Sequence, residues 1–279
     1  MFEPLVLMVA PNGAKRTKVD HAAIPVTPEE TAAVALDCLN AGANAIHFHV
    51  RDQHEKHSLD TGLYREALAV LESKIGDKMV VQVTTEAVGI YTAAEQRALV
   101  KELKPSAISM AVREFFPNKE EAKASAEMVH DYLDSGCSPQ FIVLSPEELH
   151  QFNQLCEQGL VPAGKHNVLF VLGRYTENQQ SDPRDMIPFI EANEQKHRWS
   201  ICAFGSQERA CAALAMSLGG HVRLGLENSS WRADGEVVED NATVIAEGKA
   251  LATLLGRTLA TVSQANELLK SSLEPREQT

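Results

Sequence analysis

Short apolar runs alternate along the chain with longer stretches in which apolar residues recur at helical spacing. The first run, residues 5–10, predicts a strand, and Pro11-Asn12-Gly13 ends it. Seven later runs of the same kind predict strands over residues 45–50, 79–83, 107–112, 141–144, 168–172, 199–204 and 221–226. A segment that favours a helix follows each strand.

Several of these helices begin with characteristic capping residues. Thr27, Thr92 and Ser145 each precede a Glu three residues later, which predicts three capping boxes. Asp182-Pro183 predicts the start of a short helix, and Ser206 is the expected N-cap of a helix that runs to residue 218. The other helices are expected over residues 63–75, 119–133 and 241–255.

Eight strand-then-helix units, with no linker rich in Pro, Gly or Ser between them, favour an α/β protein built as one closed (β/α)8 TIM barrel. An open doubly wound sheet is the alternative, but no glycine-rich fingerprint opens any of the helices. We therefore expect residues 1–279 to form a single barrel domain, with a short, polar and frayed C-terminal tail from about residue 270.

Composition narrows the class of protein. Hydrophobic residues make up 44% of the chain and charged residues 23%, which is ordinary for a globular protein. The formal net charge of −12 argues against a nucleic-acid partner, and no apolar run approaches the roughly 18 residues of a membrane span. Five cysteines without a CxxC pair and a start that lacks a signal-peptide pattern predict reduced thiols and a cytoplasmic protein.

His47 and His49 stand out because both lie in the apolar run at residues 45–50. Residues i and i+2 of a strand point to the same side, roughly 6.5 Å apart, so both imidazoles face one way near the strand's carboxyl end. Two neutral imidazoles on a rigid strand supply half of a divalent-metal site. The alternative is a pair of core histidines bonded to backbone carbonyls. The histidines interpreted as solvated are His21, His54, His57, His130, His150, His166 and His197.

In a TIM barrel the working side chains lie at the carboxyl ends of the strands. Glu227 follows the eighth predicted strand, and Arg223, four residues earlier, is expected deeper on the same barrel face. Two histidines and one carboxylate are a common ligand set for catalytic zinc and some other divalent metals, which polarise a carbonyl as Lewis acids. The further candidates at strand ends are Lys15, Thr84, Thr85, Glu86 and Arg113.

Two stretches carry a resemblance to a known family. Residues 42–52, Gly-Ala-Asn-Ala-Ile-His-Phe-His-Val-Arg-Asp, and residues 218–228, Leu-Gly-Gly-His-Val-Arg-Leu-Gly-Leu-Glu-Asn, resemble the two signatures of the β-keto acid cleavage enzymes. The resemblance covers nearly the whole chain. It implies a zinc-dependent barrel enzyme in which His47, His49 and Glu227 hold the metal.

The resemblance also implies a reaction and an assembly. A β-keto acid and acetyl-CoA would be converted to acetoacetate and a new acyl-CoA, with Arg223 positioning a base and Thr84 supplying a hydroxyl. The family is typically homotetrameric. Zinc, manganese, cobalt and nickel stay open as the metal, because the residues do not choose among them.

This chain departs from the family pattern at the expected active site. Asn228 stands where the family usually carries an Asp that pairs with the arginine, and an amide cannot supply its negative charge. Thr84-Thr85-Glu86-Ala87 replaces the family's Ser-Thr-Gly-Gly, so Glu86 adds bulk and charge. Lys15 replaces a Glu that would receive an ammonium group, which predicts an anionic substrate tail, supported by Arg113.

Alternatives remain at this stage. The departures at Asn228, Glu86 and Ala87 leave open a CoA-independent lyase or aldolase, or a hydrolase, on a keto acid. A metal-binding barrel that has lost catalysis is the third interpretation. Lys15 on a surface loop is otherwise simply solvated, and Glu86 otherwise pairs with Arg51 or another cation at the barrel rim.

Overall fold

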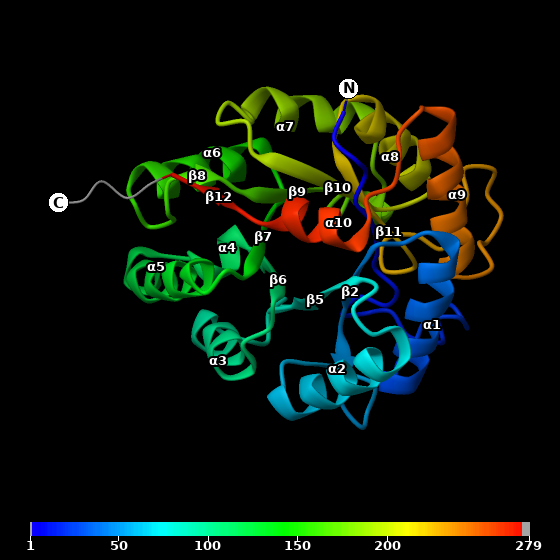
Figure 1. Cartoon of the computed structure of the whole chain (residues 1–279), viewed down its shortest axis with the longest axis horizontal. Helices are drawn as coiled ribbons and strands as arrows, with labels where there is room; N and C mark the ends of the chain where they lie inside the picture. The colour runs from blue at the N-terminus through cyan, green and yellow to red at the C-terminus, as the bar shows by residue number, and fades with distance from the viewer. Residues whose placement is uncertain (1, 275–279) are drawn as a thin grey trace.

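The computed structural model of the chain describes residues 2–274, and eight parallel strands in it close into a barrel (Figure 1). The order around the barrel is β1-β11-β10-β9-β7-β6-β5-β2. The strand bounds are β1 Leu7–Val9, β2 Ala45–Phe48, β5 Val80–Thr84, β6 Ala107–Ala111, β7 Ser138–Val143, β9 Asn167–Leu172, β10 Arg198–Ala203 and β11 His221–Leu224. This closure confirms the predicted (β/α)8 TIM barrel and rules out the open sheet.

Helices surround the barrel on its outside (Figure 1). One such helix follows each barrel strand along the chain: α1 Pro28–Ala41, α2 Thr61–Ile75, α3 Ala93–Leu103, α5 Lys119–Asp134, α6 Pro146–Glu157, α7 Met186–Ala192, α8 Glu208–Ser217 and α9 Asn241–Leu254. Their buried faces pack on the outward-facing residues of the strands; Tyr64 of α2, for example, packs edge-on against Phe48 with ring centroids 5.7 Å apart.

A further helix, α10 (Val262–Leu269), closes the amino-terminal end of the barrel. Its Ala265 and Leu268 cluster with Val6 and with Val80 and Ala107, which are the first residues of their strands. The sequence analysis did not predict this helix, and it placed the polar tail from about residue 270, directly after it. Because this end is filled with apolar side chains, access to the barrel interior is left to the carboxyl end of the strands.

Two of the three predicted capping boxes are confirmed, at Thr27 and at Thr92. The third is wrong in part: the Ser145 hydroxyl caps α6, but the Glu148 carboxylate accepts from the backbone nitrogen of Leu144 instead of that of Ser145. The predicted cap at Ser206 is also wrong. Helix α8 begins at Glu208, and the Ser206 hydroxyl donates to the side chain of Gln180.

Two short elements were not predicted. The end of the second predicted strand and the expected loop after it fold into a hairpin, in which β3 (Val50–Arg51) pairs antiparallel with β4 (His57–Ser58). Beyond β6 the chain turns at once into the four-residue helix α4 (Val112–Phe115). The side chains of Arg113 and Glu114 therefore project from a helical turn and not from the end of a strand.

The C-terminal segment is partly paired. Ser272–Leu273 (β12) forms an antiparallel pair with Gly164–Lys165 (β8), so the expectation of a frayed tail is wrong for these residues. The rest of the predicted tail, residues 275–279, lies outside the described residues. The 3-10 turns are η1 Glu177–Gln179 and η2 Pro183–Asp185, the latter at the predicted Asp182-Pro183 start.

Polar side chains fill the middle of the barrel instead of an apolar core. They are His47, Gln82, Gln140, Asn167, Ser200 and Arg223, all less than 5% exposed. His47 is in register with Gln82 on β5, and Gln140 with Asn167 on β9. Within residues 2–274, none of the helices is both long and apolar enough to cross a membrane.

Candidate metal centre and active site

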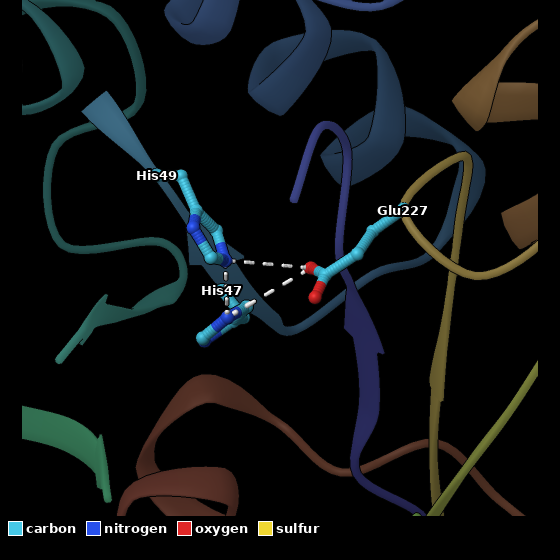
Figure 2. A group of neighbouring side chains, drawn as sticks. All are labelled: His47, His49 and Glu227. Atoms are coloured by element: carbon cyan, nitrogen blue, oxygen red, sulfur yellow. Dashed lines mark hydrogen bonds and ion pairs between the residues drawn. The ribbon is translucent and has the colours of Figure 1, made fainter. Parts of the chain in front are cut away.

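His47 and His49 present their Nε2 atoms to Glu227, as Figure 2 shows. The two Nε2 atoms are 3.1 Å apart, and Oε2 of Glu227 lies 3.8 Å from each of them. One ligand atom from each of the three residues lies within 4.8 Å of the others, and all three side chains are buried. The structure thus brings together the two strand histidines and the carboxylate from the far end of the chain.

The turn after β11 places Glu227 in this position. Gly225 has a φ of +146°, and a Cβ on it would lie 2.3 Å from the carbonyl oxygen of Ala10. The backbone nitrogen of Glu227 donates to the same Ala10 carbonyl. Gly13 lies on the other side of the carboxylate, where an added Cβ would be 2.5 Å from Cγ of Glu227. The hydrogen bond of its backbone to Ala10 and the close approach of Gly13 to its side chain therefore restrict where Glu227 can lie.

The charges in this site favour a bound cation. Burial, aided by Arg223, lowers the pKa of His47 to about 4, and burial lowers that of His49 well below its usual value, so both imidazoles are neutral at pH 7. Burial opposes ionisation of Glu227, but the nearby guanidinium groups, Arg223 first and then Arg174 and Arg51, favour the charged carboxylate, and its pKa is lowered. Oε2 of Glu227 is buried without a hydrogen-bond partner. Two neutral imidazoles and one unsatisfied carboxylate oxygen fit a divalent transition metal.

Arg223 contacts Glu227, four residues after it in the sequence, and has donors to spare. Its Nη2 lies 3.2 Å from Oε1 of Glu227 and 3.2 Å from Sγ of Cys202. Its Nε and Nη1 are buried without a partner. A small cavity opens above it at the carboxyl end of the barrel and includes His47 and Glu227 in its walls. Unsatisfied guanidinium donors in such a cavity are suited to bind an oxyanion.

Asn228 faces away from this cavity. Its amide nitrogen donates to the carboxylate of Glu208 at 3.0 Å and to the backbone carbonyl of Arg223 at 2.9 Å. Its Oδ1 accepts from the thiol of Cys202 at 3.1 Å. Burial raises the pKa of Glu208 to about 7. The amide therefore holds the main chain and surroundings of Arg223, and its side chain makes no bond to the guanidinium.

Thr84 and Glu86 both line the cavity on the side of β5. The Thr84 hydroxyl accepts from the backbone nitrogen of Glu86 at 3.1 Å. Glu86 pairs with Arg174, a residue that the sequence analysis missed, and its Oε2 lies 4.0 Å from Nδ1 of His49. Arg51 is engaged elsewhere, because its guanidinium donates to the backbone carbonyls of the loop after β1.

The two cationic candidates for substrate binding differ in position. Arg113 lines the cavity, pairs with Glu148, and lies over the ring of Tyr175 at 5.2 Å. Lys15 is exposed and is not among the residues that line the cavity. Its neighbour Arg16 turns inward instead, and donates to the carbonyl of Leu226 at 2.8 Å. Of the two, Arg113 alone lines the cavity.

The interpretation of the other histidines as solvated is wrong for three of them. His57, His166 and His197 are 6%, 1% and 2% exposed. His166 and His197 pack on Phe152, away from the group of His47, His49 and Glu227, which we call the metal candidate. His57 returns on β4 to lie beside His49, with ring centroids 5.1 Å apart. Strand β4, which carries His57, is two residues long and follows a polar turn. The sequence around His57 therefore shows no alternation of apolar and polar residues that would have predicted a strand.

Comparison with known proteins gives one consistent result. The family model described as beta-keto acid cleavage enzyme matches residues 4–270. The 3-keto-5-aminohexanoate cleavage enzyme of Fusobacterium nucleatum subsp. nucleatum is 28% identical over 276 residues, covering 96% of this chain and 98% of the relative. The 3-oxoadipate:acetyl-CoA acetyltransferase of Cupriavidus necator is 25% identical over 279 residues, covering 96% and 95%.

Among solved structures, apo ObcA is similar in fold. It matches with a TM-score of 0.71 at 15% sequence identity, over 90% of this chain and 66% of the ObcA chain. The chain thus spans just under two thirds of the length of ObcA. At this identity the likeness supports the barrel architecture alone.

Proposed function

Since the chain belongs to the beta-keto acid cleavage enzyme family, we propose that it converts a β-keto acid and acetyl-CoA into acetoacetate and a new acyl-CoA. In this exchange the bond between the keto carbon and C2 of the acid breaks. The acetyl group moves to C2, and the released acyl group moves to the sulfur of CoA. The name of the Cupriavidus necator relative, an acetyl-CoA acetyltransferase that acts on 3-oxoadipate, supports the use of acetyl-CoA here.

The observation that carries the proposal is the convergence of His47, His49 and Glu227 at the carboxyl end of the barrel. These residues would hold zinc or another divalent transition metal, and the unpartnered Oε2 of Glu227 supports this assignment. Bound there, the ion supplies Lewis-acid polarisation of the keto acid's carbonyl.

The side chains beside it bind and orient the substrate. Arg223 offers the unpaired Nε and Nη1 donors to an oxygen of the keto acid that gains negative charge during the reaction. Thr84 presents its hydroxyl from the opposite wall of the cavity. Asn228 acts on the arginine through its main-chain carbonyl and serves as a positioning residue. An amide cannot take up a proton, so Asn228 is not the base.

We further propose that the substrate carries an anionic tail, bound by Arg113 and Arg174. Both guanidinium groups line the cavity beyond the metal candidate. Each is paired with one carboxylate, Glu148 or Glu86, which orients it and leaves other N–H groups for a ligand. Lys15, the residue that first suggested an anionic tail, contributes only to the charge of the outer rim.

Three finer expectations complete the proposal: zinc as the metal, a homotetramer, and a cytoplasmic location. The His-His-Glu ligand set supports zinc among the divalent metals. The cysteines are all unpaired thiols, which supports a reducing compartment. The tetramer rests on the family alone. Metal analysis of the purified protein and light scattering on a sizing column measure the first two directly.

Mass spectrometry of reaction products is the test of function. Metal-loaded protein is incubated with acetyl-CoA and a panel of β-keto acids with anionic, neutral and cationic tails, beside His49→Ala as control. The expected result is acetoacetate plus one new acyl-CoA, absent with the control. Cleavage without a new thioester would establish a CoA-independent lyase or hydrolase instead. Bound metal with no turnover of any acid would indicate an inactive metal-binding barrel.

A further inference from the structure

His47 and His49 each have a partner on the side of the ring that faces away from Glu227. Nδ1 of His47 lies 2.9 Å from Oε1 of Gln82, its register neighbour on β5. Nδ1 of His49 lies 3.4 Å from Nδ1 of His57 on the hairpin. The Nε2 atoms of both rings point to Glu227 (Figure 2). A neutral imidazole carries one N–H, so a hydrogen on Nδ1 leaves Nε2 with a free lone pair.

The partner of His47 ends a chain of amides that crosses the barrel. The amide nitrogen of Asn167 donates to the backbone carbonyl of Leu268 at 3.3 Å, and its Oδ1 accepts from Gln140 at 2.7 Å. Oε1 of Gln140 then accepts from Gln82 at 3.3 Å. Because the backbone carbonyl can only accept, it sets the direction of every amide in the chain. Oε1 of Gln82 is left to accept from Nδ1–H of His47.

The partner of His49 is directed in the same way from the other side. Nε2 of His57 lies 2.8 Å from the backbone carbonyl of Glu86, which can only accept, so the hydrogen of this imidazole is on Nε2. Nδ1 of His57 is then an acceptor and takes a hydrogen bond from Nδ1–H of His49. The β3–β4 hairpin, with Arg51 opposite His57, is what returns the ring to this place.

We propose that Gln82 and His57 are positioning residues that fix the tautomers of His47 and His49, so that both Nε2 atoms present lone pairs to a divalent cation. With both Nδ1 atoms donating, the two Nε2 atoms, 3.1 Å apart, and Oε2 of Glu227 face one another as three acceptors. A cation among them satisfies all three at once. The inference rests on the proposed metal centre and assigns roles to two residues outside its ligand set.

Matched pairs of variants test each residue. His57→Asn keeps an acceptor close to the position of Nδ1, whereas His57→Leu is of similar size and has none. Gln82→Glu keeps an acceptor for His47 and loses the donor to Gln140, whereas Gln82→Met removes both. His166→Leu removes a buried histidine that packs on Phe152 outside the site and controls for general loss of packing. The measurements are the dissociation constants of zinc and cobalt by chelator competition and the visible absorption of the cobalt-loaded protein.

The expected result is about 10- to 100-fold weaker metal binding and an altered cobalt spectrum for His57→Leu and Gln82→Met, with near wild-type values for His57→Asn, Gln82→Glu and His166→Leu. Wild-type affinity and spectrum in folded His57→Leu and Gln82→Met would overturn the inference. So would equal losses within each pair. A third outcome separates the two proposals. If the wild type binds metal and the variants show these losses, but the wild type turns over no β-keto acid, the proposed function fails while the roles of Gln82 and His57 stand.

Discussion

Glu86 and Arg174 are joined at the mouth of the barrel, with Oε1 of the carboxylate 2.9 Å from Nη2 of the guanidinium across 88 residues of sequence. The ring of Phe204 supports Arg174 from below, at 5.0 Å from Cζ. The other carboxylate oxygen, Oε2, lies 4.0 Å from Nδ1 of His49. The ion pair of Glu86 with Arg174 thus lies in the wall of the cavity and beside His49.

Replacing Arg174 by Met is expected to lower kcat/KM for a β-keto acid with a second carboxylate by about 10-fold or more, because a charged hydrogen bond to the tail is lost. A keto acid of the same length with a neutral tail should change about 3-fold or less. Steady-state kinetics with both substrates measure the ratio. Lys15→Met is the matched control and should alter neither value strongly. Equal losses for the two acids would contradict the anionic-tail proposal.

Gly13 and Gly76 form a matched pair for the confinement of Glu227. Their φ angles are +63° and +58°, but a Cβ on Gly13 would lie 2.5 Å from Cγ of Glu227, and one on Gly76 would meet nothing within 4 Å. Both Ala variants should lose roughly 1 to 3 kcal/mol of stability, because each places a side chain on a backbone with positive φ. Gly13→Ala alone should also weaken metal binding, by about 10-fold, as measured by chelator competition. Unchanged affinity in Gly13→Ala would show that the carboxylate can move without cost.

Asn228→Asp would restore the carboxylate usual in the family, and here we expect it to destabilise the protein. The Asn228 amide donates to the buried carboxylate of Glu208, so the variant would place two carboxylates together. A loss of about 2 kcal/mol or more in the free energy of unfolding at pH 8 follows from their repulsion and burial.

The double variant Asn228→Asp/Glu208→Gln exchanges the two groups and keeps one amide facing one carboxylate. It should recover most of the lost stability in urea unfolding at pH 8. If the single variant Asn228→Asp and the double variant were equally stable, repulsion between the carboxylates at positions 228 and 208 would not be the cause of the loss.

The buried histidines far from His47, His49 and Glu227 are expected to contribute to a loss of stability on acidification. Burial lowers the pKa of His166 and of His197 to about 4 and that of His221 to about 3, against 6.5 as the ordinary value. Between pH 6.5 and 4 the unfolded chain therefore binds protons that the folded chain does not. The free energy of unfolding falls with decreasing pH, by up to about 1.4 kcal/mol per pH unit for each such histidine.

Urea unfolding of metal-free protein at pH 6.5, 5.5 and 5.0 measures this slope. His166→Gln removes one of the three groups and should make the slope shallower by about one proton. An identical slope in the variant would show that His166 takes up its proton in the folded state as well.

Much of the fold and the centre of the site were accessible from local patterns. Apolar runs at regular intervals predicted the eight strands, and the two confirmed capping boxes at Thr27 and Thr92 marked helix starts within a residue. His47 and His49 lie two apart on one strand, so their common orientation follows from strand geometry alone. The Glu after the eighth strand was placed near them by barrel closure. These features depend on neighbours in sequence or on a single global assumption, the closed barrel.

The remaining features depended on which loops and side chains meet after the barrel closes. Three contacts are of this kind: the pairing of Glu86 with Arg174, the bond of His57 to the carbonyl of Glu86, and the amide chain from Asn167 to Gln82. The bonds that make them join residues 27 to 88 positions apart. Glu148 likewise left its expected capping box to pair with Arg113. No local periodicity encodes such contacts, because each partner's preference is satisfied equally well by water until tertiary packing excludes it.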